Sequence, residues 1–334
     1  MATNYLYGTI LTNEAVAANN RGDNLGNTTT LQKVFHQDDV HTSVSAESIR
    51  FALRYRFQLE DLETNRTYES NKLEYKDEDR AYRSTSDDIF IDDDLMGYMD
   101  AKGAKEEKED VISENASENS EELTVPKETK KKKVKGRQAT VRPSPLATGR
   151  AVSLRPYRGE LSFNAVSGEK VKGKLSLYNA EMHTTEYQYS FGLNLDDVVK
   201  KENIGHLIDA VVDPPQVAGN HARFAYDFSP YSVVFRVTNA HSSKIQNCFE
   251  HDEENRTFAV ARLIKRVESK DISADELIIG GEITNTDEGK RLKELGVTVF
   301  NGVGEAAKEA RKRIADKGES FAVLGEKEGV RKSV

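Results

Sequence analysis

The sequence predicts an α+β protein in which strands and helices are distributed along the whole of its 334 residues. Residues Tyr5–Thr12 alternate between two sets of side chains, as a strand does, and Ser45–Glu60 places apolar residues at helical spacing. Between Glu276 and Ala315, two short Val- and Ile-containing runs alternate with two helix-like segments. The length suits one elaborated domain or two modest ones.

The first sixty residues predict a strand, a polar loop and a helix, in that order. The loop spans Asn13–Thr30 and is rich in Asn and Gly. Ser43 or Ser45 can cap the helix, and Glu47 suits the positive end of the helix dipole. The apolar stripe expected on the buried face of this helix consists of Ile49, Ala52, Leu53 and Phe57.

A change of composition at about residues 62–142 divides the rest of the chain. Between Asp77 and Glu122 there are 17 Asp and Glu against 5 Lys and Arg, so the remainder is net positive although the whole chain carries −8. We expect Met99–Val141 to be mobile, because without a hydrophobic period it cannot bury enough apolar surface to offset chain entropy. The sequence thus predicts three parts, residues 1–61, an insertion over 62–142, and 143–334.

Beyond the insertion, strand-like and helix-like patterns return. The expected strands are Gly159–Val166, Lys172–Leu177, Thr185–Leu195, Phe224–Phe228, Ser232–Thr238, Glu276–Ile279 and Val297–Phe300. The expected helices are Lys200–Val212, which stops before two prolines, Thr286–Leu295 and Glu305–Ala315.

The polar loop and the helix after it carry the residues best suited to bind nucleic acid. A Gly- and Asn-rich loop ahead of a helix N-terminus presents backbone N–H groups to an anion, and nearby polar side chains can donate hydrogen bonds to phosphate and sugar oxygens. An ordinary polar loop with a capped helix explains the same residues equally well. The candidate RNA-binding residues are Asn13, Asn19, Asn20, Arg21, Asn27, His41, Ser43, Ser45, Ser48, Arg50 and Arg54.

A second candidate cluster lies at Val217–Arg223, between an expected helix and an expected strand. Gly219 allows close approach of the backbone to a ligand, and Asn220 and Arg223 supply hydrogen-bond donors for RNA. A plain turn with an exposed arginine is the alternative interpretation of this stretch.

Signals for catalysis are weak. Asp38 and Asp39 precede the expected helix and could hold a divalent metal, although paired acids in a loop are more often solvated. Cys248 is the single cysteine, so no intramolecular disulfide can form, and it lacks the context of a nucleophile. Zinc patterns and a phosphate-binding G-x-x-x-x-G-K-[ST] loop are absent from the sequence. We therefore expect no metal, no cofactor and no enzymatic activity.

The N-terminus shows no signal peptide, and no apolar run approaches the roughly 20 residues that a membrane helix needs. We therefore expect a cytoplasmic protein without membrane contact.

Five sequence blocks follow one another in a particular order. They are GTILTNEAVAANNRGDNLGNTTTLQKV, HTSVSAESIRFALR, SPLATGRAVSLRP, TTEYQYSFGLNL and VAGNHARFAYDFSPYSVVFRVT. Together they resemble the DevR-type branch of the Cas-seven family, the backbone subunits of type I-B CRISPR surveillance complexes (Cascade). The resemblance covers most of the chain outside residues 62–142 and is weaker in the tail.

This resemblance implies a modified RNA-recognition (ferredoxin-like) palm, with an antiparallel sheet backed by helices, a thumb hairpin and a flexible finger insertion. Tyr5–Thr12 would be the first palm strand, Ser45–Glu60 the first palm helix, and 62–142 the fingers. Glu160 and Ser162 stand where an ordinary RNA-recognition domain has base-stacking aromatic residues, which favours binding of the RNA backbone.

The resemblance also implies a function without catalysis. Copies of such a subunit polymerise along a guide crRNA and present its bases for pairing with target DNA, in contact with other Cascade subunits. Two alternatives stay open at this point. One is a guide-directed RNA-cleaving backbone subunit that uses Asp38 or Asp39, and the other is a DNA-binding autoregulator, although the sequence shows no helix-turn-helix with a basic recognition helix.

Overall fold

A central sheet organises the chain in the computed structural model, which describes residues 3–18, 24–36, 38–69, 72–76, 88–100, 140–165, 177–217, 226–254 and 257–325. All neighbouring strands of this sheet are antiparallel except β19 and β20. The strand order is β20 (Thr298–Phe300), β19 (Leu277–Gly281), β16 (Pro230–Thr238), β1 (Tyr5–Thr12), β15 (Tyr187–Asn194), β12 (Ala151–Ser153), β6 (Asp39–Val44) and β5 (Lys33–His36), with β11 (Leu146–Thr148) also paired to β15. The predicted α+β class with a mainly antiparallel sheet is confirmed.

Strand β1 lies at the centre of the sheet because both of its faces are apolar. Leu6 and Ile10 belong to the core on one face, while Tyr7 and Leu11 belong to the core on the other. Gly8 is required at its position, because a Cβ atom there would lie 2.3 Å from the ring of Phe191 on β15. The first predicted strand therefore has the predicted bounds, and it is buried on two sides.

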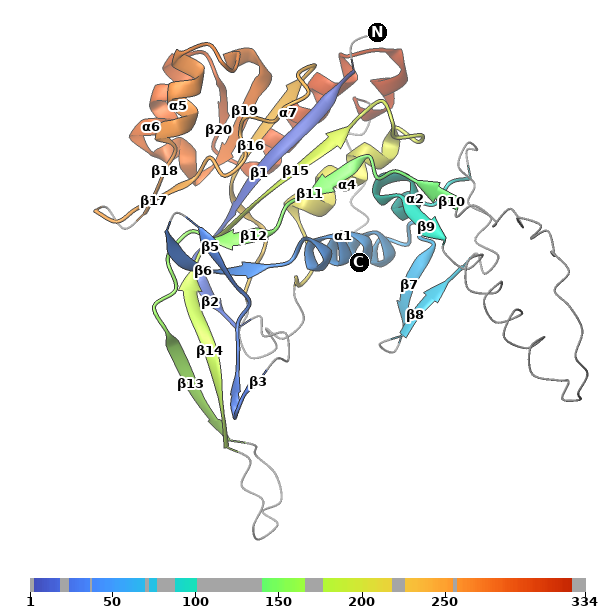
Figure 1. The fold of residues 1–334 in the computed structure, drawn as a ribbon. Helices are drawn as coiled ribbons and strands as arrows, with labels where there is room; N and C mark the ends of the chain where they lie inside the picture. The colour runs from blue at the N-terminus through green and yellow to red at the C-terminus, as the bar shows by residue number, and fades with distance from the viewer. Residues whose placement is uncertain are drawn as a thin grey trace, which may run out of the picture.

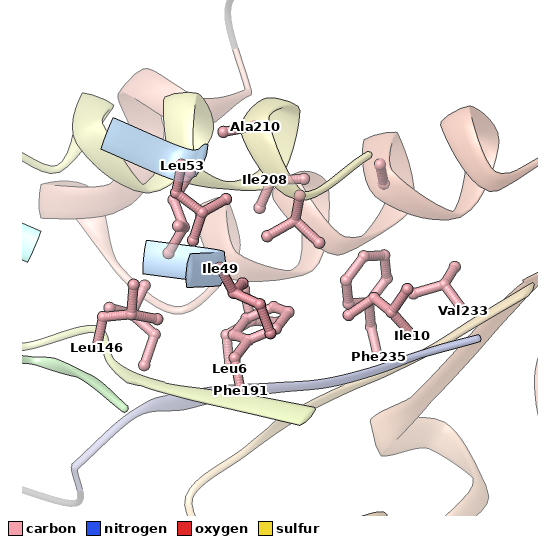
Figure 2. Close-up of a cluster of buried hydrophobic side chains, with 14 of the residues drawn as sticks. Leu6, Ile10, Ile49, Leu53, Leu146, Phe191, Ile208, Ala210, Val233 and Phe235 are labelled. Carbon is pink, nitrogen blue, oxygen red and sulfur yellow. The ribbon is translucent and has the colours of Figure 1, made fainter. Parts of the chain in front are cut away.

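Helices cover both faces of the sheet. On one face, α1 (Ala46–Leu59), α2 (Ile91–Met96), α4 (Glu202–Val212) and α7 (Val303–Ala315) form the larger core with the sheet. Ile49 of α1 reaches toward Leu6 and Phe191 on the sheet (Figure 2). Each large apolar side chain that is fully buried in this way contributes about 1.5–3 kcal/mol to the free energy of unfolding.

The opposite face of the sheet is covered by the tail of the chain, which Figure 1 shows in orange at the upper left. Helices α5 (Ala261–Glu268) and α6 (Asp287–Glu294) pack there in a second apolar core, beside the hairpin of β17 (Glu250–Asp252) and β18 (Thr257–Ala259). Short 3₁₀ turns occupy Ala274–Glu276, Glu282–Asn285 and Glu319–Leu324. We call residues 257–300, which include α5, β19, α6 and β20, the tail unit.

Two further pieces project from the sheet (Figure 1). One is a hairpin of β13 (Glu160–Ala165) and β14 (Leu177–Thr185), joined by β2 (Ala15–Ala17), β3 (Asn24–Leu25) and β4 (Thr28–Thr29). The other, which we call the insertion base, contains α2 with β7 (Arg66–Glu69), β8 (Lys72–Tyr75), β9 (Tyr98–Asp100) and β10 (Thr140–Arg142). Most of the stretch predicted to be mobile lies outside the described residues.

Most strand and helix predictions agree with the structure, and the disagreements have local causes. The described part of Phe224–Phe228 is not a strand; the Tyr226 hydroxyl there donates a hydrogen bond to the Thr185 carbonyl oxygen at 3.0 Å. Asp38 and Asp39 lie at the turn between β5 and β6, so a strand separates them from the helix. Helix α5 and the β17–β18 hairpin had no predicted counterpart.

Candidate nucleic-acid interface

The N-terminus of α1 presents hydroxyl groups at the surface next to strand β6. Ser45 is the N-cap, and its hydroxyl accepts a hydrogen bond from the Ser48 backbone N–H at 3.2 Å. The Ser48 hydroxyl lies 3.1 Å from that of Ser45. Both side chains are partly exposed, so the helix end carries polar groups that can meet a ligand. Of the two caps predicted from the sequence, Ser45 is the one used.

Arg50 lies on the same helix and reaches toward the insertion base. Its guanidinium donates to the Met96 carbonyl oxygen at 2.8 Å and to the Leu146 carbonyl oxygen at 3.0 Å. Burial lowers the pKa of Arg50, and the neighbouring charges of Arg54 and Arg66 lower it further. The predicted contact residue Arg50 therefore also links the helix to α2 of the insertion base and to strand β11.

Three consecutive aspartates of α2, Asp92, Asp93 and Asp94, are buried beneath this helix. Asp92 lies 3.2 Å from the Arg54 guanidinium, and Asp94 lies 2.9 Å from that of Arg142. All three side chains are almost completely shielded from solvent. Such buried carboxylates are retained only where positive charges and hydrogen-bond donors compensate for lost hydration.

The arginines of this network also line a surface pocket of about 440 Å³. Within the part of the chain that is described, the buried Nε atom of Arg142 has no hydrogen-bond partner. The three aspartates are buried, so the charged groups that line the pocket are the guanidiniums of four arginines and the carboxylate of Glu47. Guanidinium groups suit phosphate oxygens. The residues lining this cationic pocket are Glu47, Arg50, Arg54, Arg66, Met96, Gly97, Tyr98, Arg142 and Ser144.

Next to the cationic pocket, along α1, lies an aromatic hollow of about 550 Å³. The ring of Phe51 contacts that of Tyr68 edge to face, with centroids 4.5 Å apart, and is stacked on Tyr55 at 6.1 Å. Phe51 remains 36 % exposed. The sequence offered one signal for this hollow, two aromatic residues four positions apart on the face of the helix that lacks the apolar stripe. The residues lining the hollow are Glu47, Ser48, Phe51, Arg54, Tyr55, Tyr68 and Gln216.

Three candidate residues have buried side chains that bond to other parts of the protein. The ring of His41 is buried and its Nδ1 lies 2.7 Å from the Ser153 carbonyl oxygen. Ser43 is fully buried and its hydroxyl accepts a hydrogen bond from Arg150 at 3.2 Å. Arg54 is 8 % exposed and paired with Asp92. In this conformation His41 and Ser43 are not accessible to RNA, whereas the small exposed part of Arg54 lines both the cationic pocket and the aromatic hollow.

The remaining candidates are divided between exposed positions and residues outside the described ranges. Asn13 and Asn27 are exposed, and both belong to the segment between β1 and β5. The structure thus brings Ser45, Ser48 and Arg50 together on α1. The candidates that lie outside the described residues are Asn19, Asn20, Arg21, Asn220 and Arg223.

The residues considered for catalysis lie apart from these hollows. Asp38 and Asp39 are exposed at the β5–β6 turn, where Asp38 has a φ of 67°. Cys248 is buried, and burial raises its pKa to about 12. A thiol with such a pKa is uncharged at neutral pH and is a poor nucleophile.

Comparisons with known proteins all indicate one group of CRISPR-associated proteins. Residues 8–277 match the family model described as "CRISPR-associated negative auto-regulator DevR/Csa2". A protein of Myxococcus xanthus (strain DK1622) named "CRISPR-associated protein Cas7/Cst2/DevR" is 36 % identical over 321 residues, which cover 93 % of this chain and 97 % of that protein.

Solved structures resemble the fold at low sequence identity. A chain of a "CRISPR RNA-guided surveillance complex" matches with a TM-score of 0.53 and 14 % identity, covering 92 % of this chain and 99 % of its own. A chain of such a complex described as "pre-nicking" matches with the same TM-score and 13 % identity, covering 92 % of this chain and 100 % of its own.

None of the helices in the described ranges is long and apolar enough to cross a membrane.

Proposed function

The chain belongs to the Cas7/Cst2/DevR family of CRISPR-associated proteins, and from this membership we propose that it is a guide-RNA-binding backbone subunit of a surveillance complex. The observation that carries the proposal is the extent of the family match, which spans the sheet, α1 and the projecting hairpin. The cationic pocket on α1 supports it, because guanidinium groups and helix-end hydroxyls are the groups that hold a nucleic-acid backbone without reading its sequence.

In this proposal the central sheet with α1, α4 and α7 is the palm. The β13–β14 hairpin is the thumb, and the insertion over residues 62–142 forms the fingers. We place the protein in the cytoplasm, in a type I-B complex, where several copies follow one another along a single crRNA. Such a head-to-tail contact is heterologous and generates an open helical array. The guide bases, held by their backbone, then pair with target DNA, and pairing rather than protein contact supplies the specificity.

The experiment that tests RNA binding compares the wild type with Arg21→Ala, Arg50→Ala, measuring affinity for a synthetic guide RNA over a range of salt concentrations. We expect weaker binding. We also expect the slope of log affinity against log salt concentration to be less steep by about 0.7 for every phosphate that is no longer bound. Arg291→Ala is the matched control, since it removes an exposed charge from α6 on the opposite face of the sheet. Because Arg50 also bonds Met96 and Leu146, the melting temperature of each variant is measured alongside. Unchanged affinity and slope in a folded double variant would contradict the proposal.

We further propose that the subunit does not cut RNA. The complex assembled with guide should leave complementary RNA intact in the presence of Mg²⁺ or Mn²⁺, and Asp38→Asn with Asp39→Asn should change nothing in that assay. Regularly spaced, metal-dependent cuts that disappear in this variant would identify an RNA-cleaving subunit instead. Specific binding to a DNA operator without guide RNA would support the autoregulator that the name of the family model suggests.

A further inference from the structure

The aromatic hollow on α1 is a preformed surface. Tyr68 is held against Phe51 by Gln58, which makes two reciprocal hydrogen bonds to its backbone: the Tyr68 N–H donates to Gln58 Oε1 at 3.1 Å, and Gln58 Nε2 donates to the Tyr68 carbonyl oxygen at 3.3 Å. Among the described residues, β7 pairs with a strand on one edge only, the edge next to β8. On its other edge, the Gln58 side chain makes the two hydrogen bonds that a neighbouring strand would make. The rings are therefore fixed before any ligand arrives, which lowers the entropic cost of binding.

The chemistry of the rim suits a planar, polar ligand better than an aliphatic one. Ser48, Gln216 and Glu47 place a hydroxyl, an amide and a carboxyl group around the rings. A hydrogen bond to the backbone N–H of Glu47 itself lowers the pKa of that carboxyl group, so it is ionised at neutral pH and accepts hydrogen bonds. Donors and acceptors surrounding exposed aromatic rings match the edge and the face of a nucleobase.

The hollow also adjoins the cationic pocket, because Glu47 and Arg54 line both. An aromatic surface next to a group of guanidiniums fits the two parts of one nucleotide, the base and its phosphate. A protein segment would need apolar side chains opposite the rings and acidic ones opposite the arginines within a few residues, whereas every nucleotide carries both features.

We propose that this hollow receives one unstacked base of the guide RNA, while an adjacent phosphate lies against Arg50, Arg66 and Arg142 in the cationic pocket. This inference rests on the proposed function. It adds a base contact that tolerates any sequence, since every base has a flat face that can stack on Phe51 and Tyr68.

The test measures binding of the full-length protein to a single-stranded guide RNA and to the same RNA with its bases removed at successive positions. Phe51→Ala should weaken binding to the intact RNA about 5- to 150-fold, the range for losing one stacked base, and leave the salt dependence unchanged because no charge is removed. Phe51→Tyr keeps the ring and should bind as the wild type does. Leu59→Ala, which truncates an exposed side chain of the same helix outside the hollow, should have no effect.

The RNA lacking bases supplies the decisive comparison. Removal of the base that occupies the hollow should weaken the wild type and leave Phe51→Ala unchanged, so the two proteins should bind that RNA equally. If a folded Phe51→Ala protein binds intact RNA like the wild type, the inference is wrong while the proposed function stands. The same conclusion follows if Phe51→Ala impairs only the assembly with other proteins and not RNA binding. If the wild type itself does not bind guide RNA, the proposed function fails and this inference fails with it.

Discussion

The insertion base and the tail unit are attached to the same sheet by different physical means. The tail unit packs through an apolar core that includes Ile279, Leu292 and Val297. Near the edge of this core the buried Arg236 pairs with the partly exposed Glu276. The insertion base also makes apolar contacts through Ile91 and Leu95 of α2, but it adds three buried carboxylates and the arginines that face them. An apolar contact is tolerant of small changes, whereas a buried ionic contact depends on every partner being present. The comparison shows that the ionic contacts have a second role, because the arginines that hold the insertion base also line the cationic pocket.

The largest effect is expected from Asp94→Ala. The Asp94 carboxylate accepts hydrogen bonds from the Val199 and Lys200 backbone N–H groups and from Arg142. Its removal leaves a buried arginine and backbone donors uncompensated, so the free energy of unfolding should fall by about 3–5 kcal/mol. Urea denaturation checks this value, and Asp94→Asn, which keeps one acceptor oxygen, should lose less. A decrease below about 1 kcal/mol for the alanine variant would show that the insertion base does not depend on its charges.

A smaller, pH-dependent effect is expected from Asp93→Asn. Burial and the adjacent Asp92 raise the pKa of Asp93 to about 6, above its ordinary value of 3.8. Between these two pH values the folded state binds more protons than the unfolded chain, so the free energy of unfolding contributed by this group decreases as the pH rises through 6. The asparagine variant lacks this decrease and should gain about 1.5 kcal/mol relative to the wild type between pH 5 and pH 8.

Paired urea denaturation at pH 5 and pH 8 measures the difference for Asp93→Asn. Asn65 donates to Asp93 Oδ2 at 2.8 Å and can still do so to the amide oxygen of the variant. A pH-independent difference between the two proteins would contradict the shifted pKa.

The smallest effects come from a matched pair of helix caps, one on α1 next to the insertion base and one on α6 in the tail unit. Ser45 caps α1 and Thr286 caps α6, each accepting one backbone N–H. Either alanine substitution should cost about 1 kcal/mol in the free energy of unfolding. Only Ser45→Ala should also weaken guide-RNA binding, because its hydroxyl lies at the proposed interface. Equal RNA affinities for the two variants would remove Ser45 from that interface.

Much of the tail unit could be predicted because its signals are local. Short apolar runs such as Val297–Phe300, and the Thr286 cap, specify their strands and helices within a few residues. The acidic run was harder to interpret, because Asp92–Asp94 looks like part of a solvated charge cluster. Its burial depends on Arg54 and Arg142, 38 and 48 residues away along the chain.

The candidate site was predicted in part, for the same reason. Ser45, Ser48 and Arg50 belong to one helix, so their proximity follows from the sequence. His41 and Ser43 looked equally suitable, but they lie on β6 and are covered by β12, a pairing across more than a hundred residues. Phe51 and Tyr55 were not predicted, although they stand four positions apart on the helix, and Tyr68 is added by a hairpin whose position no local pattern indicates.

The central place of β1 has a consequence for biosynthesis. Its two partners are β15 and β16, and the second of these ends at Thr238. At a translation rate of about 5–20 residues per second, β1 leaves the ribosome roughly 10 to 50 s before its last partner is made. Until then the apolar strand YLYGTILT is not paired on both sides, so the nascent chain must be kept from aggregating, and the central sheet is complete only after β20, which ends at Phe300, has been synthesised.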